Sequence, residues 1–326
     1  VFHHTPSMIH HYDFDLFVIG GGSGGVRAAR MAGQRGARVA LAECAELGGT
    51  CVNVGCVPKK LYSYAAGYAA AFEEAPGYGW TLPEAPRFDW ATLKRQRAQE
   101  ITRLNGVYQK LLDGAGVKTL TGWAQLVDGH TVSVSDTRYT ARHILVATGG
   151  MPAAPDMPGR ELAVVSDAMF DLPDFPKRLL VMGGGYIGCE FASLFRGLGA
   201  HVTLVNRGAH ILNGFDDDVR EALAREMGRQ GIDLRMTAQV ETLRREGDGL
   251  VAMLSRGQQI EADTVLLATG RKPNTAGMGL DAAGVKLDAR GAVVVDAQYR
   301  SSVPSVLAIG DVSSRLALTP VALAEA

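Results

Sequence analysis

Short apolar runs that end in glycine recur along the chain, and they predict parallel strands of an α/β fold. The first run covers 15–19 and is followed by a small-residue turn, a helical stretch over 26–33 and another apolar run over 38–42. The same order returns as strand, glycine turn, helix and strand over 178–182, 183–188, 189–197 and 200–205. A strand, a glycine turn, a helix and a second strand begin a dinucleotide-binding unit.

Both glycine turns carry the spacing GxGxxG, which permits a tight turn, close approach of a pyrophosphate and packing of the helix on the strand. The helix N-terminus also favours a negative charge. The residues expected at the cofactors are Gly20, Gly22, Ser23, Gly24 and Gly25 in the first turn and Gly183, Gly185, Ile187 and Gly188 in the second. Each nucleotide-binding unit ends with an apolar strand that is followed by a glycine, over 144–149 and 265–270. Two such units predict two bound dinucleotides.

Two segments that are typical of domain boundaries divide the chain into three stretches. The prolines of 151–158 end the first unit, and the RKPN sequence closes the second at residue 274. We therefore expect domains over 1–150, 151–274 and 275–326, the second inserted in the first. The elements expected besides the two nucleotide units are a long helix over 90–112 and strands over 292–295 and 306–309.

The residue after the second strand of each unit predicts which nucleotide the unit accepts. Glu43 lies 18 residues after Gly25, where a carboxylate accepts hydrogen bonds from the ribose hydroxyls and repels a 2′-phosphate. This site should hold FAD or NAD. The matching residue of the second unit is Asn206, and Arg207 follows it. A guanidinium beside the ribose favours a 2′-phosphate, so we expect NADPH rather than NADH at the second site.

Cys51 and Cys56, within the sequence CVNVGCVPKK, are the strongest candidates for chemistry. Their spacing differs from CxxC, and no second pair of ligands completes a zinc site, so we expect no metal. Pro58 suits the first turn of a helix reaching about residue 72. Cys56 would then lie at the helix N-terminus with Lys59 and Lys60 close by, which stabilises a thiolate. The pair is predicted to be a catalytic dithiol/disulfide, and Cys44 and Cys189 to be ordinary thiols.

Composition excludes several classes of protein. The 326 residues are 47% hydrophobic and 21% charged, as in globular proteins, so the chain is not disordered. A net charge of −1 argues against nucleic acid or an anionic membrane as partner. Four cysteines are too few for a secreted disulfide scaffold, and no apolar run is long enough for a membrane span. Residues 1–15 do not resemble a signal peptide, Met8 is a possible true start, and the histidines there are expected to be solvated.

From about Tyr12 onward the chain resembles the pyridine nucleotide-disulphide oxidoreductases, and among them the glutathione reductase branch. The resemblance rests on both glycine motifs, Glu43, the CVNVGC segment, the ATGRKPN sequence at 268–274 and the Gly310-Asp311 pair. The branch is indicated by Pro58-Lys59-Lys60, where dihydrolipoamide dehydrogenases and mercuric reductases carry Pro-Ser-Lys. These two remain alternatives within the family.

The resemblance implies two cofactors and a path for electrons. FAD would occupy the first site and NADPH the second, which makes 1–150 and 275–326 parts of an FAD-binding domain. Tyr186 would cover the nicotinamide pocket, and Lys59 or Lys60 would pair with Glu190 near the flavin. Cys56 would lie beside the flavin, and Cys51 would attack the substrate. The polar and glycine residues expected along the cofactors are Thr50, Thr148, Gly149, Asp311, Thr319 and Gly270.

The substrate that the resemblance implies is glutathione disulfide, reduced to glutathione. Ser23, Arg30 and Tyr108 match positions that contact it, and an arginine suits this anionic disulfide better than a cationic one. Arg207 matches the first of two arginines that bind the NADPH phosphate in the family, whereas the second position holds Asn213. That departure bears on the strength of the NADPH preference.

One catalytic part of the family is not found in the sequence. A histidine–glutamate pair near the family's C-terminus, supplied by the partner subunit, protonates the glutathione leaving group. No histidine here has that context, so we expect a C-terminally truncated piece that lacks the dimerisation domain, with the complete protein a cytoplasmic homodimer. The alternatives from other classes are a two-cofactor module without disulfide turnover and a redox-sensing regulator.

Overall fold

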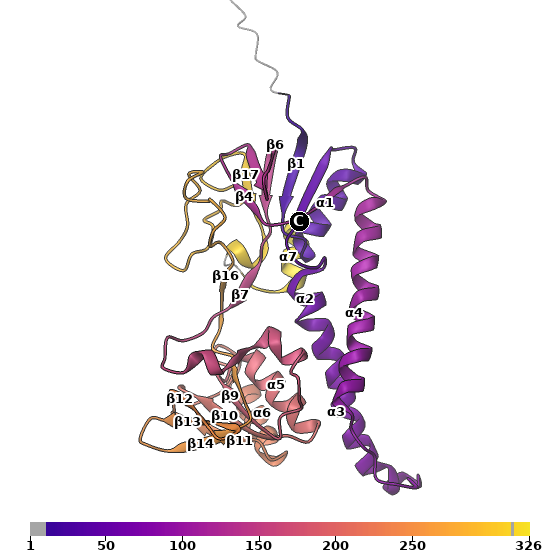
Figure 1. Cartoon of the computed structure of the whole chain (residues 1–326), viewed down its shortest axis with the longest axis vertical. Helices are drawn as coiled ribbons and strands as arrows, with labels where there is room; N and C mark the ends of the chain where they lie inside the picture. Colours follow the sequence, from indigo (N-terminus) through magenta and orange to yellow (C-terminus); the bar gives the residue numbers. More distant parts are fainter. Residues whose placement is uncertain (1–10, 314–315) are drawn as a thin grey trace, which may run out of the picture. The chain divides into compact units, whose positions relative to one another are not determined.

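The computed structural model describes residues 11–313 and 316–326, and it divides the chain into two compact units (Figure 1). The first unit comprises Val1–Cys51, Leu104–Gly150 and Lys272–Ala326, and the second comprises Val52–Arg103 and Met151–Arg271. The second unit is thus inserted in the first along the chain. The structure groups residues 52–103 with the second unit, whereas the sequence assigned all of 1–150 to the first domain.

A largely parallel sheet forms the centre of the first unit. Its strands are β1 (Phe14–Ile19), β2 (Val39–Glu43), β3 (Lys118–Thr121), β4 (Ala124–Leu126), β5 (Thr131–Val134), β6 (Thr137–Val146) and β17 (Val306–Ala308). They lie in the order β3-β2-β1-β6-β5-β4, with β17 also pairing with β6. The pairs around β1, β2, β3, β6 and β17 are parallel, and β4, β5 and β6 pair antiparallel.

Both faces of this sheet are buried, as a parallel sheet requires. Successive residues of a strand point to opposite faces, so Phe17 belongs to one hydrophobic cluster and Val18 to another. Helix α1 (Ser23–Gln34) packs Val26 and Ala29 into the cluster that contains Val18. The remaining elements of the unit are α2 (Gly49–Asn53), the end of α4 (Trp90–Asp113), η4 (Gly310–Ser313) and α7 (Thr319–Glu325).

The strand predicted over 292–295 is wrong, because these residues, all of them described, form no strand. Val293 makes a single bridge with Leu287, and its backbone N–H bonds the carbonyl of Val312. Val294 instead bonds Lys286. The sequence AVVV at 292–295 is a short apolar run, and such a run alone does not distinguish a strand from an irregular segment that is partly buried.

The second unit contains a fully parallel sheet of five strands. These are β8 (Val164–Val165), β9 (Arg178–Met182), β10 (His201–Asn206), β11 (Asp233–Met236) and β15 (Thr264–Leu267), in the order β11-β10-β9-β15-β8. A three-stranded antiparallel sheet is formed by β12 (Val240–Glu246), β13 (Gly249–Leu254) and β14 (Gln259–Ala262). Outside these sheets, β7 (Gly150–Pro152) pairs with β16 (Arg271–Pro273). The two parallel sheets confirm the predicted α/β class.

Helices cover one face of the five-stranded sheet, and the antiparallel sheet covers the other. Leu179 and Val181 of β9 pack with aromatic residues of α3 (Cys56–Glu74) and α5 (Tyr186–Gly197), whereas Leu180 packs with β12–β14. The aromatic residues include Tyr62, whose hydroxyl donates to the carbonyl of Phe170 at 2.9 Å. This core explains why residues 52–103 belong to the second unit. The other short elements are η1 (Ala75–Tyr78), η2 (Arg160–Leu162), η3 (Ser166–Phe170) and α6 (Asp217–Arg229).

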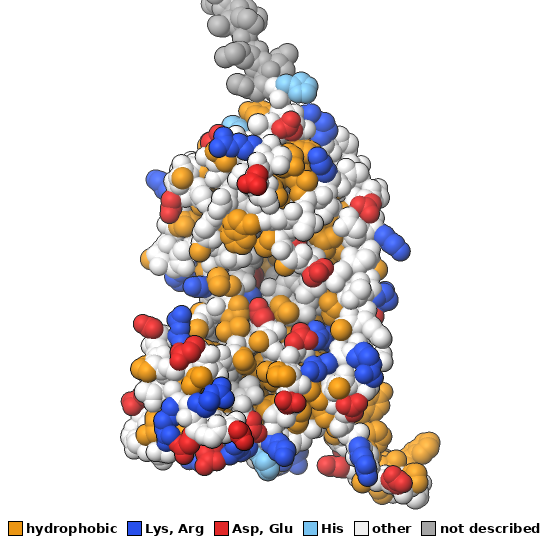
Figure 2. Space-filling view, viewed as in Figure 1, with side chains coloured by type: hydrophobic (Ala, Val, Ile, Leu, Met, Phe, Trp, Pro, Cys, Tyr) orange, Lys and Arg blue, Asp and Glu red, His pale blue; other side chains and the backbone are white. Residues whose placement is uncertain are grey.

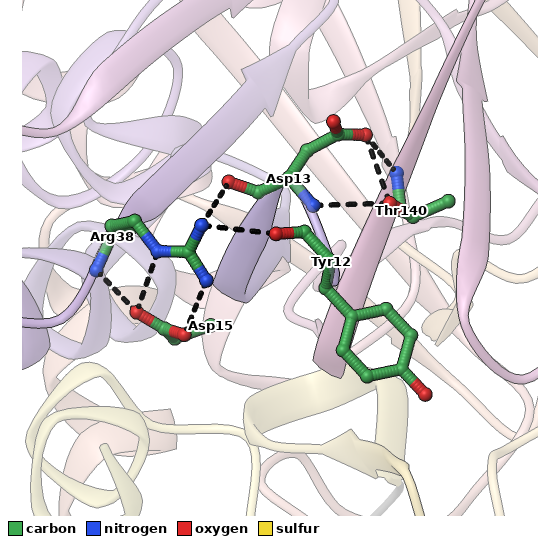
Figure 3. A network of polar contacts seen from close by, with 5 residues as sticks. All are labelled: Tyr12, Asp13, Asp15, Arg38 and Thr140. Carbon is green, nitrogen blue, oxygen red and sulfur yellow. Dashed lines mark hydrogen bonds and ion pairs between the residues drawn. The ribbon is translucent and has the colours of Figure 1, made fainter. Parts of the chain in front are cut away.

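A polar network fixes the entry of β1 into its sheet (Figure 3). The Arg38 guanidinium donates to the Asp15 carboxylate at 2.9 Å and to the carbonyl of Tyr12 at 3.0 Å. Asp13 accepts hydrogen bonds from the Thr140 backbone N–H at 2.8 Å and from its hydroxyl at 2.9 Å. The hydrogen bonds from Arg38 lower the pKa of Asp15 to about 2. These groups are satisfied by one another, so the network is structural.

Acidic and basic side chains intermix on the visible surface (Figure 2). This agrees with the net charge of −1 and shows no broad field of one sign on that face. Among the described residues, no helix is long and apolar enough to cross a membrane.

Candidate active site

The three glycines of the first turn have the three roles that a dinucleotide site requires. Gly20 has a φ of +105°, and a Cβ there would lie 2.4 Å from the carbonyl oxygen of Ala147. A Cβ on Gly25 would lie 1.9 Å from the carbonyl oxygen of Gly20, so only glycine lets α1 pack this closely. At Gly22, by contrast, the nearest atom to a Cβ is the Cα of Gly49 at 3.9 Å. The open side of Gly22 is where a pyrophosphate can approach the backbone.

The second turn repeats this geometry. Gly183 has a φ of +113°, and its Cβ would lie 2.3 Å from the carbonyl oxygen of Ala268. A Cβ on Gly188 would lie 2.0 Å from the carbonyl oxygen of Gly183. No heavy atom lies within 4 Å of a Cβ at Gly185 among the described residues. Both turns therefore fit a dinucleotide pyrophosphate.

Each helix begins three residues earlier than the sequence indicated. The expected starts were residues 26 and 189, but α1 begins at Ser23 and α5 at Tyr186. Gly22 and Gly185 are the extended N-caps, and neither has a side-chain cap. The early starts leave backbone N–H groups at the turn without helical acceptors, and these are donors for an anion.

Polar side chains at the ends of β2 and β10 close the two turns. Glu43 Oε2 accepts the backbone N–H of Gly21 at 2.6 Å, and Oε1 accepts that of Ala45 at 2.8 Å. Asn206 Oδ1 accepts the N–H of Gly184 at 3.1 Å. Sequence reasoning placed Glu43 and Asn206 at matching positions as ribose selectors but did not foresee that each also fastens the turn.

The other residues expected near FAD gather in the first unit. Thr148 donates its hydroxyl to the carbonyl of Asn274 at 2.8 Å, which holds the exit of β6. The Asp311 side chain lies in η4 within 3.5 Å of the position of a Cβ on Gly150. Thr319 begins α7, which packs on α1 through Ala322 and Gly24. The last two expected residues are Gly149, with a φ of +69°, and the exposed Thr50 of α2.

The loop after β10 presents one cation and no carboxylate at its start. Asn206 Nδ2 donates to the carbonyls of Gly208 and His210, which folds the loop around the amide. Arg207 is exposed and has no hydrogen-bond or ion-pair partner among the described residues. Asn213, on the same loop, is also exposed. Ile187 packs on the core of the second unit, and Gly270 has a φ of +132° with no described atom near a Cβ position.

The two predicted redox cysteines lie at the ends of short helical segments. Cys51 is half-buried in α2, and Cys56 is the first residue of α3 and exposed. The helix start at Cys56 confirms that its sulfur is at an N-terminus, where the helix dipole favours a thiolate. Within the described chain, no group of three or more metal-ligating side chains is found.

Lys59 forms the ion pair with Glu190, which decides between the two lysines. Lys59 Nζ contacts Glu190 Oε2, and it lies 5.7 Å from the centre of the Tyr186 ring. The Lys59 side chain is 16% exposed, whereas Glu190 is 47% exposed. Lys60 points elsewhere, because its Nζ lies 4.9 Å from the exposed Tyr64 ring. The helical register could have indicated this, since Lys60 and Tyr64 are four residues apart on the exposed side of α3.

Tyr108 lies close to Cys51 within the first unit. Burial raises the pKa of the Tyr108 hydroxyl, and the nearby Cys51 thiolate charge raises it further. Ser23 begins α1 and Arg30 lies farther along the same helix. The segment before Cys51 is tied to the first glycine turn by a hydrogen bond from Gly48 N–H to the Gly21 carbonyl at 2.8 Å.

The remaining two cysteines are poor nucleophiles. Burial raises the pKa of Cys189 to about 11, with Glu190 adding to the shift, and its thiol donates to the carbonyl of Gly184. Burial also raises the pKa of Cys44, helped by the Glu43 charge. This supports their interpretation as ordinary thiols. Met8 and the histidines at 3, 4 and 10 lie outside the described residues.

Comparison with known proteins gives concordant matches. The model of the pyridine nucleotide-disulphide oxidoreductase family matches residues 14–326. A glutathione reductase of Burkholderia cepacia is 49% identical over 96% of this chain and 70% of its own length. A chloroplastic/mitochondrial glutathione reductase of Pisum sativum is 43% identical over 96% of this chain and 59% of its own length. A glutathione reductase of Nostoc is 43% identical over 96% of this chain and 71% of its own length.

The family model spans nearly the whole chain, and both glycine turns have the geometry its cofactors FAD and NADPH need. Each of the three relatives also covers 96% of the chain. This chain is therefore a member of the pyridine nucleotide-disulphide oxidoreductase family.

Proposed function

We propose that the chain carries the NADPH-dependent reduction of glutathione disulfide to glutathione, with Cys51 and Cys56 as the redox pair. The observation that carries this proposal is the Lys59–Glu190 pair beside Tyr186. It joins the helix that begins at Cys56 to the helix of the second glycine turn, so one cluster serves both the dithiol and the nicotinamide site. The names of the relatives support the choice of substrate.

Residues of the first unit would hold FAD. The free backbone N–H groups after Gly22 would bind the pyrophosphate, and Glu43 has lone pairs left for the ribose hydroxyls. Asp311 and Thr319 would hold the rest of the cofactor near the exit of β6. When bound, the flavin supplies the transfer between a two-electron hydride donor and a dithiol.

Residues of the second unit would select NADPH. Asn206 removes the negative charge that would repel a 2′-phosphate, and Arg207 is free to bind one. Asn213 supplies hydrogen bonds but no second charge, so the preference would rest mainly on Arg207. Tyr186 is 46% exposed and has room to move when the nicotinamide enters.

Lys59 and the two cysteines would each have a separate role in the electron transfer to the substrate. Lys59 would hold a positive charge at the reacting flavin edge, and Glu190 would fix its side chain there. Cys56, at the start of α3, would be kept as the thiolate by the helix end. Cys51 would attack the substrate disulfide, displacing a glutathione thiolate and forming a mixed disulfide. Thiolate attack by Cys56 would then release the second glutathione and close the Cys51–Cys56 disulfide.

The proposal extends to assembly and location. The histidine–glutamate acid/base pair would come from a partner subunit, so the complete enzyme would be a homodimer. A dithiol of this kind is kept reduced most easily in the cytoplasm. Size measurement of the complete protein in solution tests the dimer, and a single-subunit mass would contradict it.

The direct test is made on the FAD-loaded 326-residue chain. We expect NADPH, and far less NADH, to reduce the flavin anaerobically and to give the long-wavelength absorbance of a thiolate beside flavin. Oxidation of NADPH by glutathione disulfide would show the whole reaction. Flavin reduction without disulfide turnover would support the two-cofactor module instead. Turnover with dihydrolipoamide and NAD, or with mercuric ion, would contradict the proposed substrate.

Two lysine variants sharpen this test. Replacing Lys59 by Met removes the positive charge that we place at the flavin edge, and we expect flavin reduction to slow by about 100-fold, which corresponds to roughly 3 kcal/mol in the activation free energy. Replacing Lys60 by Met should change the rate by less than about twofold, because Lys60 is exposed and its Nζ lies over the Tyr64 ring rather than at Glu190. Equal rates for the two variants would remove Lys59 from its assigned role.

A further inference from the structure

The peptide group between Leu47 and Gly48 is hydrogen-bonded at both ends. Its carbonyl accepts the side-chain amide of Asn105, with 2.7 Å between Nδ2 and the oxygen. Its N–H donates to the carbonyl of Gly21 in the first glycine turn at 2.8 Å. The carbonyl and the N–H of a planar trans peptide point in opposite directions. This one peptide group therefore links α4 to the first glycine turn, within the first unit.

The 47–48 peptide precedes a backbone stretch that is free to rotate on its own. Gly48 has a φ of +101° and Gly49 a φ of +61°. Glycine adopts many backbone conformations, so two glycines in succession do not fix the direction in which the chain continues. Helix α2 begins at Gly49 and carries Cys51. The direction of the helix that carries Cys51 therefore depends on how the 47–48 peptide is held.

Asn105 shares one face of α4 with side chains that pack around the same segment. Asn105, Tyr108 and Leu112 are three and four residues apart, which places them on one side of the helix. Leu112 is buried in the hydrophobic cluster that contains Leu47, and Tyr108 packs against this cluster. Tyr108 also lies close to Cys51. The same helix face thus contributes to the cluster around Leu47 and binds its carbonyl.

Asparagine is disfavoured in the interior of a helix unless its side chain has a partner elsewhere. It has a low helix propensity, and its amide competes for backbone groups. Asn105 nevertheless lies inside α4, and Gly106, another weak helix former, follows it. The Asn105 side chain is partly buried and donates to Leu47. The reason for an asparagine here is therefore found in the tertiary contact and not in the helix.

We propose that Asn105 is a positioning residue for the disulfide reaction, because it fixes the 47–48 peptide and so holds the Cys51 thiol beside Tyr108. The inference rests on the proposed function, in which Cys51 is the thiol that attacks the substrate. Attack of a thiolate on a disulfide requires the reacting sulfur atoms to be aligned, so a small rotation of α2 would slow it. Asn105 acts through the backbone and not through contact with the substrate.

The experiment separates the two half-reactions of the FAD-loaded chain by stopped-flow spectroscopy. Stoichiometric NADPH reduces the redox disulfide anaerobically through the flavin, and glutathione disulfide then reoxidises the dithiol with release of two molecules of glutathione. The variants are Asn105→Ala and Asn105→Asp. The matched control is Gln109→Ala, one helical turn further along α4. The Gln109 amide donates to Asp113 at 2.7 Å and to Thr119 at 3.3 Å, away from the 47–48 peptide.

We expect both Asn105 variants to lower the limiting rate of reoxidation by about 10-fold, because the attacking thiol is displaced. The glutathione disulfide concentration at half the limiting rate should change by less than about twofold, since the groups that bind substrate are unchanged. Flavin reduction by NADPH and FAD retention after gel filtration should match the unchanged chain. Gln109→Ala should match the unchanged chain in both half-reactions.

Asn105→Asp adds a pH dependence that a merely structural role would not produce. The ionised carboxyl that it introduces has no proton to donate and repels the Leu47 carbonyl, whereas the protonated carboxyl is a donor. The reoxidation deficit of Asn105→Asp, taken relative to the unchanged chain, should therefore shrink between about pH 8 and about pH 5, as the carboxyl begins to take up its proton. The deficit of Asn105→Ala should stay constant over the same range.

Other outcomes overturn the inference in distinguishable ways. An unchanged limiting rate in Asn105→Ala would show that the hydrogen bond does not position the thiol. A raised half-saturating concentration with an unchanged limiting rate would make Asn105 a substrate-binding residue instead. An equal loss in Gln109→Ala, or loss of FAD, would indicate a general effect on the helix or the cofactor site.

Each of these outcomes leaves the proposed function intact, because the unchanged chain still reacts. An unchanged chain whose reduced dithiol is not reoxidised by glutathione disulfide would instead overturn the proposed function together with this inference.

Discussion

The two glycine turns of this chain have closely similar backbone geometry, but a different polar side chain fastens each of them. A Cβ added to the first or third glycine would meet the equivalent carbonyl oxygen in both turns, at nearly the same distance. A Cβ added to the middle glycine would face open space in both turns. The residue that fastens the turn is Glu43 in the first unit and Asn206 in the second. The backbone therefore creates a pyrophosphate site in each unit, and the side chain decides which nucleotide follows.

The difference also changes the loops beyond the turns. The second carboxylate oxygen of Glu43 accepts from Ala45 and can only accept. The amide of Asn206 donates to the carbonyls of Gly208 and His210, and this folds the loop that carries Arg207. An amide at this position thus removes a charge and at the same time positions a cation.

The largest effect is expected from adding a methyl group to the third glycine of either turn. Gly25→Ala and Gly188→Ala force the helix away from the turn, because the Cβ would overlap a carbonyl oxygen. We expect a loss of about 3 kcal/mol in stability and more than 100-fold in affinity for the cofactor of that unit. Urea unfolding and cofactor titration measure the two effects.

The control for these variants is Gly67→Ala in α3. No described atom lies within 4 Å of a Cβ at this position, and the backbone there is helical. Alanine should therefore leave stability unchanged or raise it by up to about 1 kcal/mol. A loss at Gly67 equal to that at Gly25 would show that the close contacts are not the cause.

Asn206→Asp should shift the second site toward a nucleotide without a 2′-phosphate, which is the kind of nucleotide expected at the first site. The variant keeps an acceptor for Gly184 but places a carboxylate near a 2′-phosphate and against the Gly208 and His210 carbonyls. We expect the ratio of NADP⁺ to NAD⁺ affinity to fall by about 30-fold, or 2 kcal/mol. Fluorescence titration of both nucleotides checks it, and an unchanged ratio would remove Asn206 as a selector.

Glu43→Gln should weaken the first site without changing its backbone. Glutamine can still accept the Gly21 N–H, but it loses the charge that strengthens the ribose hydrogen bonds. We expect FAD to bind about 10-fold more weakly, measured by dialysis and flavin absorbance. Retention of full affinity would mean that Glu43 serves only to fasten the turn.

The smallest effect concerns Cys189, which matches Val26 of the first unit as the residue after the third glycine. Burial raises its pKa from 9.0 to about 11, so the stabilisation by the protonated thiol is fully present below about pH 9. This stabilisation is lost as the pH rises toward 11. Cys189→Val should cost under about 1.5 kcal/mol at pH 7 and flatten the alkaline fall in stability. Urea unfolding at pH 7 and pH 10 compares the two chains.

Much of the site was predictable because its chemistry is local in sequence. The glycine spacings, Glu43, Arg207 and the cysteine segment each depend on a strand, turn and helix that are close along the chain. The helix starts at Ser23 and Tyr186 were missed, because glycine and tyrosine have modest helix propensity and the turn geometry overrides it. The strand over 292–295 was wrongly predicted for a different reason, since a short apolar run indicates burial but not which backbone structure is buried.

Local sequence determined that this chain has two dinucleotide turns, a cysteine pair at a helix start and a carboxylate at only one ribose position. Tertiary structure decided which lysine pairs with Glu190, because that contact joins residues far apart in the chain and depends on the packing of α3 on α5. It also decided that the Nε atom of Arg27 is buried without a hydrogen-bond partner among the described residues. A sequence lists charges, but only the packed fold determines which of them are desolvated and which remain to be neutralised by a ligand.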